Sequence, residues 1–172
     1  AGMTSLLVTQ MFPGVVMAIP LYLLLDALHL LDSLTGLVLV YSTTAIPFCV
    51  WMLKGYFDTV PRELEESALM DGASPAVIFW KIILPLSFPA LASFAIFQFL
   101  WTWNDLLVAL VFLGTDDETL VLTGRLVNLM GSRGGDWEIL ATSAFVSIAV
   151  PLVVFFAMQR YLVRGLLAGS VK

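Results

Sequence analysis

Residues 138–159 read EILATSAFVSIAVPLVVFFAMQ, and the only charged residue of this stretch is Glu138, at its first position. A helix needs about 20 apolar residues, with a rise of about 1.5 Å each, to cross the hydrocarbon core of a bilayer. Three further stretches, near 4–25, 36–55 and 88–112, are also long and apolar enough. Each is expected to be helical, because backbone polar groups in lipid must pair within the segment. The sequence therefore predicts an all-α integral membrane protein, a polytopic helical bundle.

The composition of the whole chain agrees with this class. Of the 172 residues, 60% are hydrophobic and 12% are charged, whereas about 25% of a soluble domain is charged. The formal net charge is −5, but topology depends on where Lys and Arg fall rather than on their sum. The single cysteine, Cys49, and the single histidine, His29, give neither a disulfide pair nor a thiol-based metal cluster. We expect no cofactor, no metal and no nucleic-acid partner.

Two features predict departures from straight spans. The stretch 88–112 is longer than a straight span requires, so it either tilts strongly or ends early, near Asn104 and Asp105. Prolines inside apolar stretches remove a backbone hydrogen bond and are expected to kink their helices. These prolines are Pro13, Pro20, Pro47 and Pro151.

The basic residues predict the orientation. If the 56–81 loop and the C-terminus share one side of the membrane, that side holds six basic residues, Lys54, Arg62, Lys81, Arg160, Arg164 and Lys172, and the other side holds two, Arg125 and Arg133. By the positive-inside rule, the 56–81 loop and the C-terminus are cytoplasmic. The acidic 114–137 loop is then extracytoplasmic. It contains a short amphipathic stretch around 120–130 and is either a partner surface or a spacer.

A charged element, 59–85, interrupts the apolar stretches with the sequence TVPRELEESALMDGASPAVIFWKIILP. Pro61 suits a first helical turn, and the glutamates after it complement the positive end of the helix dipole. Gly72 permits the geometry that ends a helix, while Ser74 and Pro75 are typical of a new helix start. We therefore expect two short helices around a glycine turn, lying against the membrane. They are either a surface that a partner grips or an ordinary solvated loop helix.

Polar and aromatic residues gather at the end of the 88–112 stretch. An acid within a membrane segment is costly and usually faces a cavity or a partner. Aromatic faces beside amide and carboxylate groups suit the recognition of a sugar. The alternative is an aromatic belt at the outer interface, where the acid reaches water. The candidate pathway residues are Trp101, Trp103, Asn104 and Asp105, with Gln98 about two turns earlier.

Motifs for catalysis are missing from the sequence. There is no G-x-x-x-x-G-K-[ST] phosphate loop, no G-x-S-x-G and no H-E-x-x-H. We do not expect an enzyme, and any ATPase must be a separate chain. One class that stays open is an ion-coupled secondary transporter that uses Asp105 as its ion or proton site.

The charged element resembles a known motif. Glu66-Ser67-Ala68, followed by Gly72 and Ile82-Ile83-Leu84-Pro85, is similar to the E-A-A-x3-G-x9-I-x-L-P motif of ABC importer permeases, with Ser67 in place of an alanine. Other stretches resemble the sugar-uptake permeases of the maltose-transporter type. These stretches are TQMFPGVVMAIPLY at 9–22, TAIPFCVWMLKGYFDTVPRELEESALMDGA at 44–73, WTWNDLLVAL at 101–110 and QRYLVRGLLAGSVK at 159–172.

The resemblance implies that residues 1–172 form a single transmembrane permease domain of the MetI-like fold, in the inner membrane of a prokaryote. The chain would be a permease subunit of an ATP-driven, binding-protein-dependent carbohydrate importer. The implied partners are two cytoplasmic ATP-binding subunits, a second permease subunit, an extracytoplasmic sugar-binding protein and the lipid bilayer. Permeases of this type usually have six spans, so the four found here are expected to lack two N-terminal helices.

The resemblance also implies a role for individual residues of the charged element. Glu66 would be the charge contact to the ATPase, Gly72 would set the angle between the two helices, and Asp71 would brace the turn. The implied ATPase-coupling residues are Glu66, Ser67, Ala68, Asp71 and Gly72.

Overall fold

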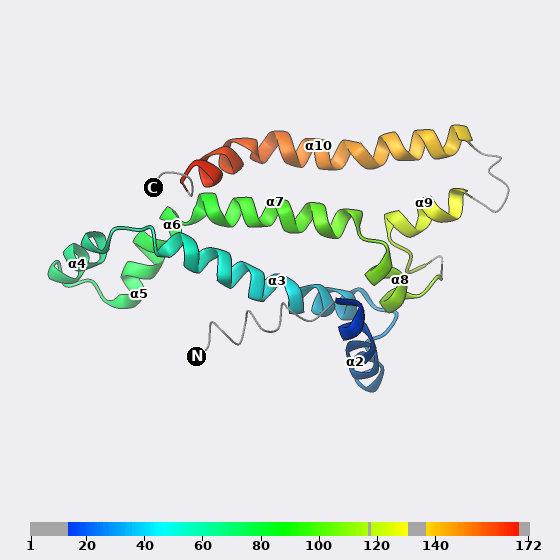
Figure 1. Ribbon diagram of the computed structural model, residues 1–172, viewed down its shortest axis with the longest axis horizontal. Coiled ribbons are helices and arrows are strands. Elements are labelled where there is room, and N and C mark those ends of the chain that lie inside the picture. Colours follow the sequence, from blue (N-terminus) through cyan, green and yellow to red (C-terminus); the bar gives the residue numbers. More distant parts are fainter. Residues whose placement is uncertain (1–13, 117, 131–136, 169–172) are drawn as a thin grey trace.

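The structure is a computed structural model that describes residues 14–116, 118–130 and 137–168. Every regular element in these ranges is a helix (Figure 1), which confirms the all-α prediction. Three parts of the predictions fall outside the described residues. They are the first part of the 4–25 span, with Pro13, the glycine-rich end of the 114–137 loop, and the last four residues of the tail.

Three long helices run along the molecule, α3 (Leu34–Phe57), α7 (Phe88–Asn104) and α10 (Trp137–Ala168). In Figure 1, α7 lies between α3 and α10, and it packs against both. The shorter α2 (Gly14–Ala27) crosses the end of α3 at an angle. Of the described helices, α3 and the Trp137–Tyr161 part of α10 are each long and apolar enough to cross a membrane.

A third crossing results if two helical segments that meet at a bend are taken as one span. Pro75–Leu86 and Phe88–Asn104 meet at 62° and pass the length and composition test together. The described part of α2 has 14 residues, which is shorter than a span needs. The described residues therefore contain two or three of the four predicted spans.

The stretch 88–112 is not one helix: of the two predicted outcomes, a strong tilt or an early end near Asn104 and Asp105, the structure has the early end. The helix α7 ends at Asn104, the backbone of Asp105 is extended (φ −72°, ψ 136°), and α8 covers Leu107–Leu113. The Asp105 carboxylate accepts hydrogen bonds from the backbone N–H groups of Val108 (3.4 Å) and Ala109 (3.0 Å). This side-chain cap satisfies donors at the start of α8 and so favours a second helix over the continuation of α7.

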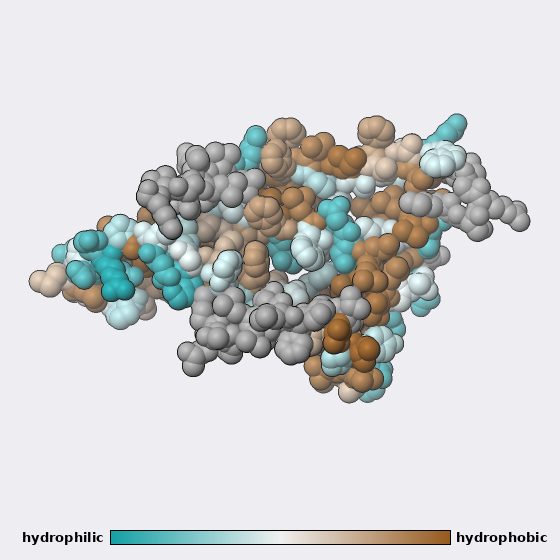
Figure 2. Space-filling model, in the orientation of Figure 1, coloured by the Kyte–Doolittle hydropathy of each residue, from teal (hydrophilic) through white to brown (hydrophobic). Residues whose placement is uncertain are grey.

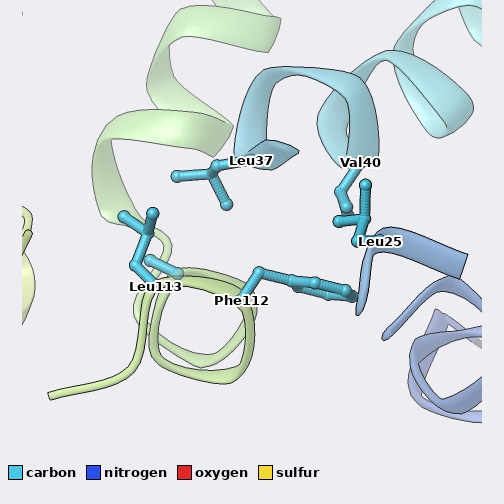
Figure 3. Packing of buried hydrophobic residues seen from close by; sticks show 6 residues of the cluster. Leu25, Leu37, Val40, Phe112 and Leu113 are labelled. Atoms are coloured by element: carbon cyan, nitrogen blue, oxygen red, sulfur yellow. The ribbon is translucent and has the colours of Figure 1, made fainter. Parts of the chain in front are cut away.

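The largest buried cluster joins α2, α3 and α8 (Figure 3). Phe112 and Leu113 of α8 are 2% and 1% exposed and pack against Leu37 and Val40 of α3 and Leu25 of α2. The Phe112 carbonyl also accepts the N–H of Asp32, in the α2–α3 turn. This cluster fixes the end of the molecule at which α7 breaks.

The long helices present apolar side chains to the outside (Figure 2). On α10, Phe145 and Val153 are 78% and 68% exposed, and on α3, Val38 is 61% exposed. Water would penalise so much exposed apolar surface, whereas lipid would not. The surface is thus that of a membrane protein.

Candidate functional site

The first candidate site is the helix pair at one end of the molecule, formed by α4 (Arg62–Met70) and α5 (Pro75–Ile78). The helix α5 continues through a π-helical turn, η1 (Phe79–Ile83), into α6 (Leu84–Leu86). In Figure 1 the pair projects beyond the long helices, and in Figure 2 this end carries hydrophilic residues. The pair is therefore a polar projection at one end of an otherwise largely apolar surface.

The turn between the two helices depends on Gly72, whose φ of 82° lies in the left-handed region. The N–H of Gly72 donates to the Leu69 carbonyl and that of Ala73 to the Ala68 carbonyl, each at 3.0 Å. These two bonds form a Schellman motif, which satisfies carbonyls at the end of α4. The predicted helix end at Gly72 is confirmed.

The second helix begins where the sequence predicts. The Ser74 hydroxyl accepts the Val77 N–H at 3.4 Å, and Pro75 occupies the first helical position. A proline fits there because its missing N–H would have no helical partner. The prediction of two helices around a glycine turn is confirmed.

The pair is held together by its own small core. Ala68 of α4, Ile78 of α5 and Ile83 of η1 are buried against one another, and Phe57, the last residue of α3, and Val60 pack on them. Burial of this apolar surface fixes α4 on α5 and on the end of α3. This core therefore connects α4 with α5, with η1 and with the end of α3.

The predicted coupling residues fall into two groups. Ala68 is buried in this core, whereas the other four, Glu66, Ser67, Asp71 and Gly72, are exposed. The Ser67 hydroxyl donates back to the Leu64 carbonyl at 3.1 Å. The exposed residues are accessible to a partner, and Ala68 determines where α4 sits.

The second candidate site is a pocket of about 230 Å³ at the opposite end, where α3, α7 and α9 (Leu122–Met130) meet. Aromatic and polar side chains line it together with apolar ones. The lining residues are Leu37, Tyr41, Phe99, Thr102, Trp103, Asp105, Val121, Leu122 and Thr123.

Asp105 connects the elements around the pocket. Its carboxylate, which caps α8, also accepts the Tyr41 hydroxyl of α3 at 2.8 Å, and its carbonyl accepts the Thr123 hydroxyl of α9 at 2.6 Å. An acid in an apolar protein is tolerable when it has such partners. The carboxylate is thus used by the chain itself, and this geometry gives no specific support to an ion site. Among the described residues, no group of three or more His, Cys, Asp or Glu side chains could hold a metal.

The structure separates the predicted pathway residues. Trp103 and Asp105 line the pocket, and Gln98 is linked to it through a 3.3 Å hydrogen bond to Thr102. Trp101 is 74% exposed, and Asn104 donates to the Leu100 carbonyl of its own helix. Helical periodicity explains the separation within α7, because Phe99 and Trp103, four residues apart, share the pocket face with Thr102, whereas Trp101 and Asn104 fall on the other side. Sequence reasoning missed Tyr41 and Thr123. Their contacts with Asp105 join residues 64 and 18 positions apart, and no local sequence pattern marks such contacts.

A family model described as the inner membrane component of binding-protein-dependent transport systems matches residues 1–167. The chain belongs to this family, whose members are transport components. The family confirms the predicted class of protein and its place among multi-pass membrane proteins.

Several relatives match most of this chain. The alpha-glucoside transport system permease protein AglG of Rhizobium meliloti (strain 1021) is 69% identical over 137 residues, covering 80% of this chain and 36% of the relative. The osmoprotective compounds uptake permease protein GgtD of Synechocystis sp. is 51% identical, covering 90% and 52%. The trehalose transport system permease protein SugB of Mycobacterium tuberculosis is 38% identical, covering 98% and 60%. The chain thus spans roughly a third to three fifths of the length of these relatives.

Proposed function

We propose that this chain is the permease domain, or part of it, of an ATP-driven, binding-protein-dependent carbohydrate importer. The names of the similar permeases, two of which mention alpha-glucoside and trehalose, support a sugar as the substrate. The chain would bind and release sugar without making or breaking a bond. Hydrolysis of ATP would take place in two separate cytoplasmic subunits, and a second permease and an extracytoplasmic binding protein would complete the importer.

The observation that carries this proposal is the packed α4–α5 pair. Its exposed Glu66 lies on a helix whose position is fixed by buried Ala68 and by the Gly72 turn. A partner that grips the exposed face would move the pair as a rigid lever, and the contact with Phe57 would pass that movement to α3. Under this proposal the helix-pair end is cytoplasmic, as the basic residues predict, and the pocket end is extracytoplasmic.

Replacement of Glu66 tests the coupling role. In the full-length protein, co-expressed with its partners, Glu66→Gln is expected to reduce ATP hydrolysis stimulated by the binding protein by about tenfold or more, the loss that removal of a charged hydrogen-bonding partner gives. Glu63→Gln is the matched control, since it changes another exposed acid of the same helix. Normal stimulated hydrolysis and normal assembly in Glu66→Gln would contradict the coupling role.

We also propose that the pocket lies on the route of the sugar. Trp103 and Asp105 would contribute an aromatic wall and a fixed carboxylate, and Gln98 would act through Thr102. Trp101 and Asn104, the other two predicted residues, would meet the substrate only in another conformation. Filling the pocket with Thr102→Leu should reduce uptake, while basal ATP hydrolysis persists. Ala95→Leu, at an exposed position of the same helix that does not line the pocket, is the control, and equal uptake in both variants would contradict the proposal.

A further inference from the structure

A proline in α10 and a tryptophan in α7 share one backbone carbonyl. In an α-helix, the N–H of residue 151 would pair with the carbonyl of residue 147, but Pro151 has no N–H. The carbonyl of Ser147 accepts instead the indole Nε1–H of Trp103, at 3.1 Å and from 44 residues away. The tryptophan thus supplies the donor that the proline removes.

We propose that Pro151 and Trp103 form a linked pair, in which the proline creates the acceptor that holds the tryptophan ring in the wall of the pocket. Ser147 is only partly buried, but the outward neighbours on α10 face lipid, where no water can satisfy an unpaired carbonyl. The hydrogen bond therefore holds the Trp103 side chain of α7 against α10 at Ser147. Pro151 and Ser147 are positioning residues, since they act on the pocket through Trp103.

The surroundings of Trp103 agree with this role. Its ring lies 5.5 Å from that of Phe99, centroid to centroid, and both rings line the pocket. The hydroxyl of Ser147 donates to the Ala144 carbonyl, and the Trp103 indole N–H goes to the backbone carbonyl of Ser147. Trp101, two residues earlier and so on nearly the opposite face of the helix, is 74% exposed and has the position expected of a lipid-facing or interfacial tryptophan. The two tryptophans of α7 therefore have different tasks.

A double-mutant cycle in the full-length, assembled importer tests the pair. Trp103→Phe keeps an aromatic ring but removes the donor, and Pro151→Ala returns a helical N–H to the Ser147 carbonyl. If the pair is linked, Trp103→Phe lowers sugar uptake by about three- to tenfold when Pro151 is retained, which is the range that one lost hydrogen bond gives. In the Pro151→Ala background, Trp103→Phe is expected to change uptake by less than about twofold, because the Ser147 carbonyl already has a helical partner.

The apparent melting temperature of the purified complex provides a second measurement that does not depend on sugar. The destabilisation by Trp103→Phe should likewise be smaller in the Pro151→Ala background. Equal effects in both backgrounds would overturn the linked pair. If Trp103→Phe prevents assembly, Pro151→Ala is expected to restore it, and a failure to do so would also overturn the proposal.

Pro47→Ala is the matched control, because Pro47 lies inside α3, another long helix. Its effect should combine with that of Trp103→Phe without interaction. The consequence for uptake rests on the proposed function, whereas the melting temperature does not. The cycle could show an interaction in melting temperature but no change in uptake. That result would support the linked hydrogen bond. It would overturn the position of Trp103 on the route of the sugar and count against the pathway proposal.

Discussion

Tyr41 and Asp105, 64 residues apart in the sequence, are joined by a 2.8 Å hydrogen bond from the tyrosine hydroxyl to the carboxylate. A second tyrosine of α3, Tyr56, donates to the carbonyl of Leu86 at 2.8 Å, just before the bend that begins α7. The helix α3 is thus tied to both ends of α7. The Tyr56 tie lies next to Phe57, which packs on the helix pair, and the Tyr41–Asp105 tie lies in the wall of the pocket.

Replacement of Asp105 by alanine is expected to destabilise the protein, because it removes the cap of α8 and the partner of Tyr41 together. The loss of a helix cap costs about 0.5–2 kcal/mol, and a hydrogen bond to a charged group contributes about 1.5–3 kcal/mol. Asp105→Asn retains an acceptor and should cost less. Thermal unfolding of the purified complex measures both, and an alanine variant as stable as the asparagine variant would contradict this account.

Tyr56→Phe removes only the hydroxyl that reaches the Leu86 carbonyl. The expected cost is about 0.5–1.5 kcal/mol, the net contribution of one hydrogen bond. Tyr22→Phe is a control, since the Tyr22 ring packs near Phe112 and this contact does not need the hydroxyl. The apparent melting temperature should fall for Tyr56→Phe and change less for Tyr22→Phe. The reverse order would show that the tie at the bend does not contribute.

Gly72→Ala is expected to destabilise the helix pair through its backbone rather than through a clash. A Cβ at Gly72 meets no atom within 4 Å, but a φ of 82° costs an L-residue about 1–2 kcal/mol. Gly55 also has open space within 4 Å, and it lies inside the helix α3, where alanine is favoured by about 1 kcal/mol. Unfolding experiments should therefore give opposite signs for Gly72→Ala and Gly55→Ala. Stability that does not decrease in Gly72→Ala would show that the turn does not require glycine.

Ser67 and Ala68, neighbours in the stretch that resembles the E-A-A motif, should differ in how replacement by leucine changes the stability of the protein. Ala68 is buried against Ile78 and Ile83, so Ala68→Leu overpacks this core and is expected to cost about 1–3 kcal/mol. Ser67 is exposed, and Ser67→Leu should change stability by no more than about 0.5 kcal/mol. The midpoint of unfolding measures both variants. Similar midpoints for the two would mean that α4 does not pack on α5 as described.

Local sequence patterns were sufficient for much of the helix pair. A positive-φ residue in a helix end is best supplied by glycine, and serine followed by proline is a favourable helix start, so Gly72, Ser74 and Pro75 could be assigned without the fold. Pro151 carries a further signal in the sequence. A proline inside a helix always leaves the carbonyl four residues earlier without its usual partner, so Pro151 could have directed attention to Ser147.

The sequence by itself determined that the chain is helical and apolar on its surface, because hydrophobicity over about 20 residues and the need to pair the backbone in lipid are local properties. Only the tertiary structure decided which polar and aromatic residues meet. Tyr41 with Asp105, Asp105 with Thr123, and Trp103 with Ser147 are pairs from different elements. Such pairs depend on how the helices pack and where each one ends, and α7 ends at Asn104 because Asp105 caps α8 rather than extending the helix before it.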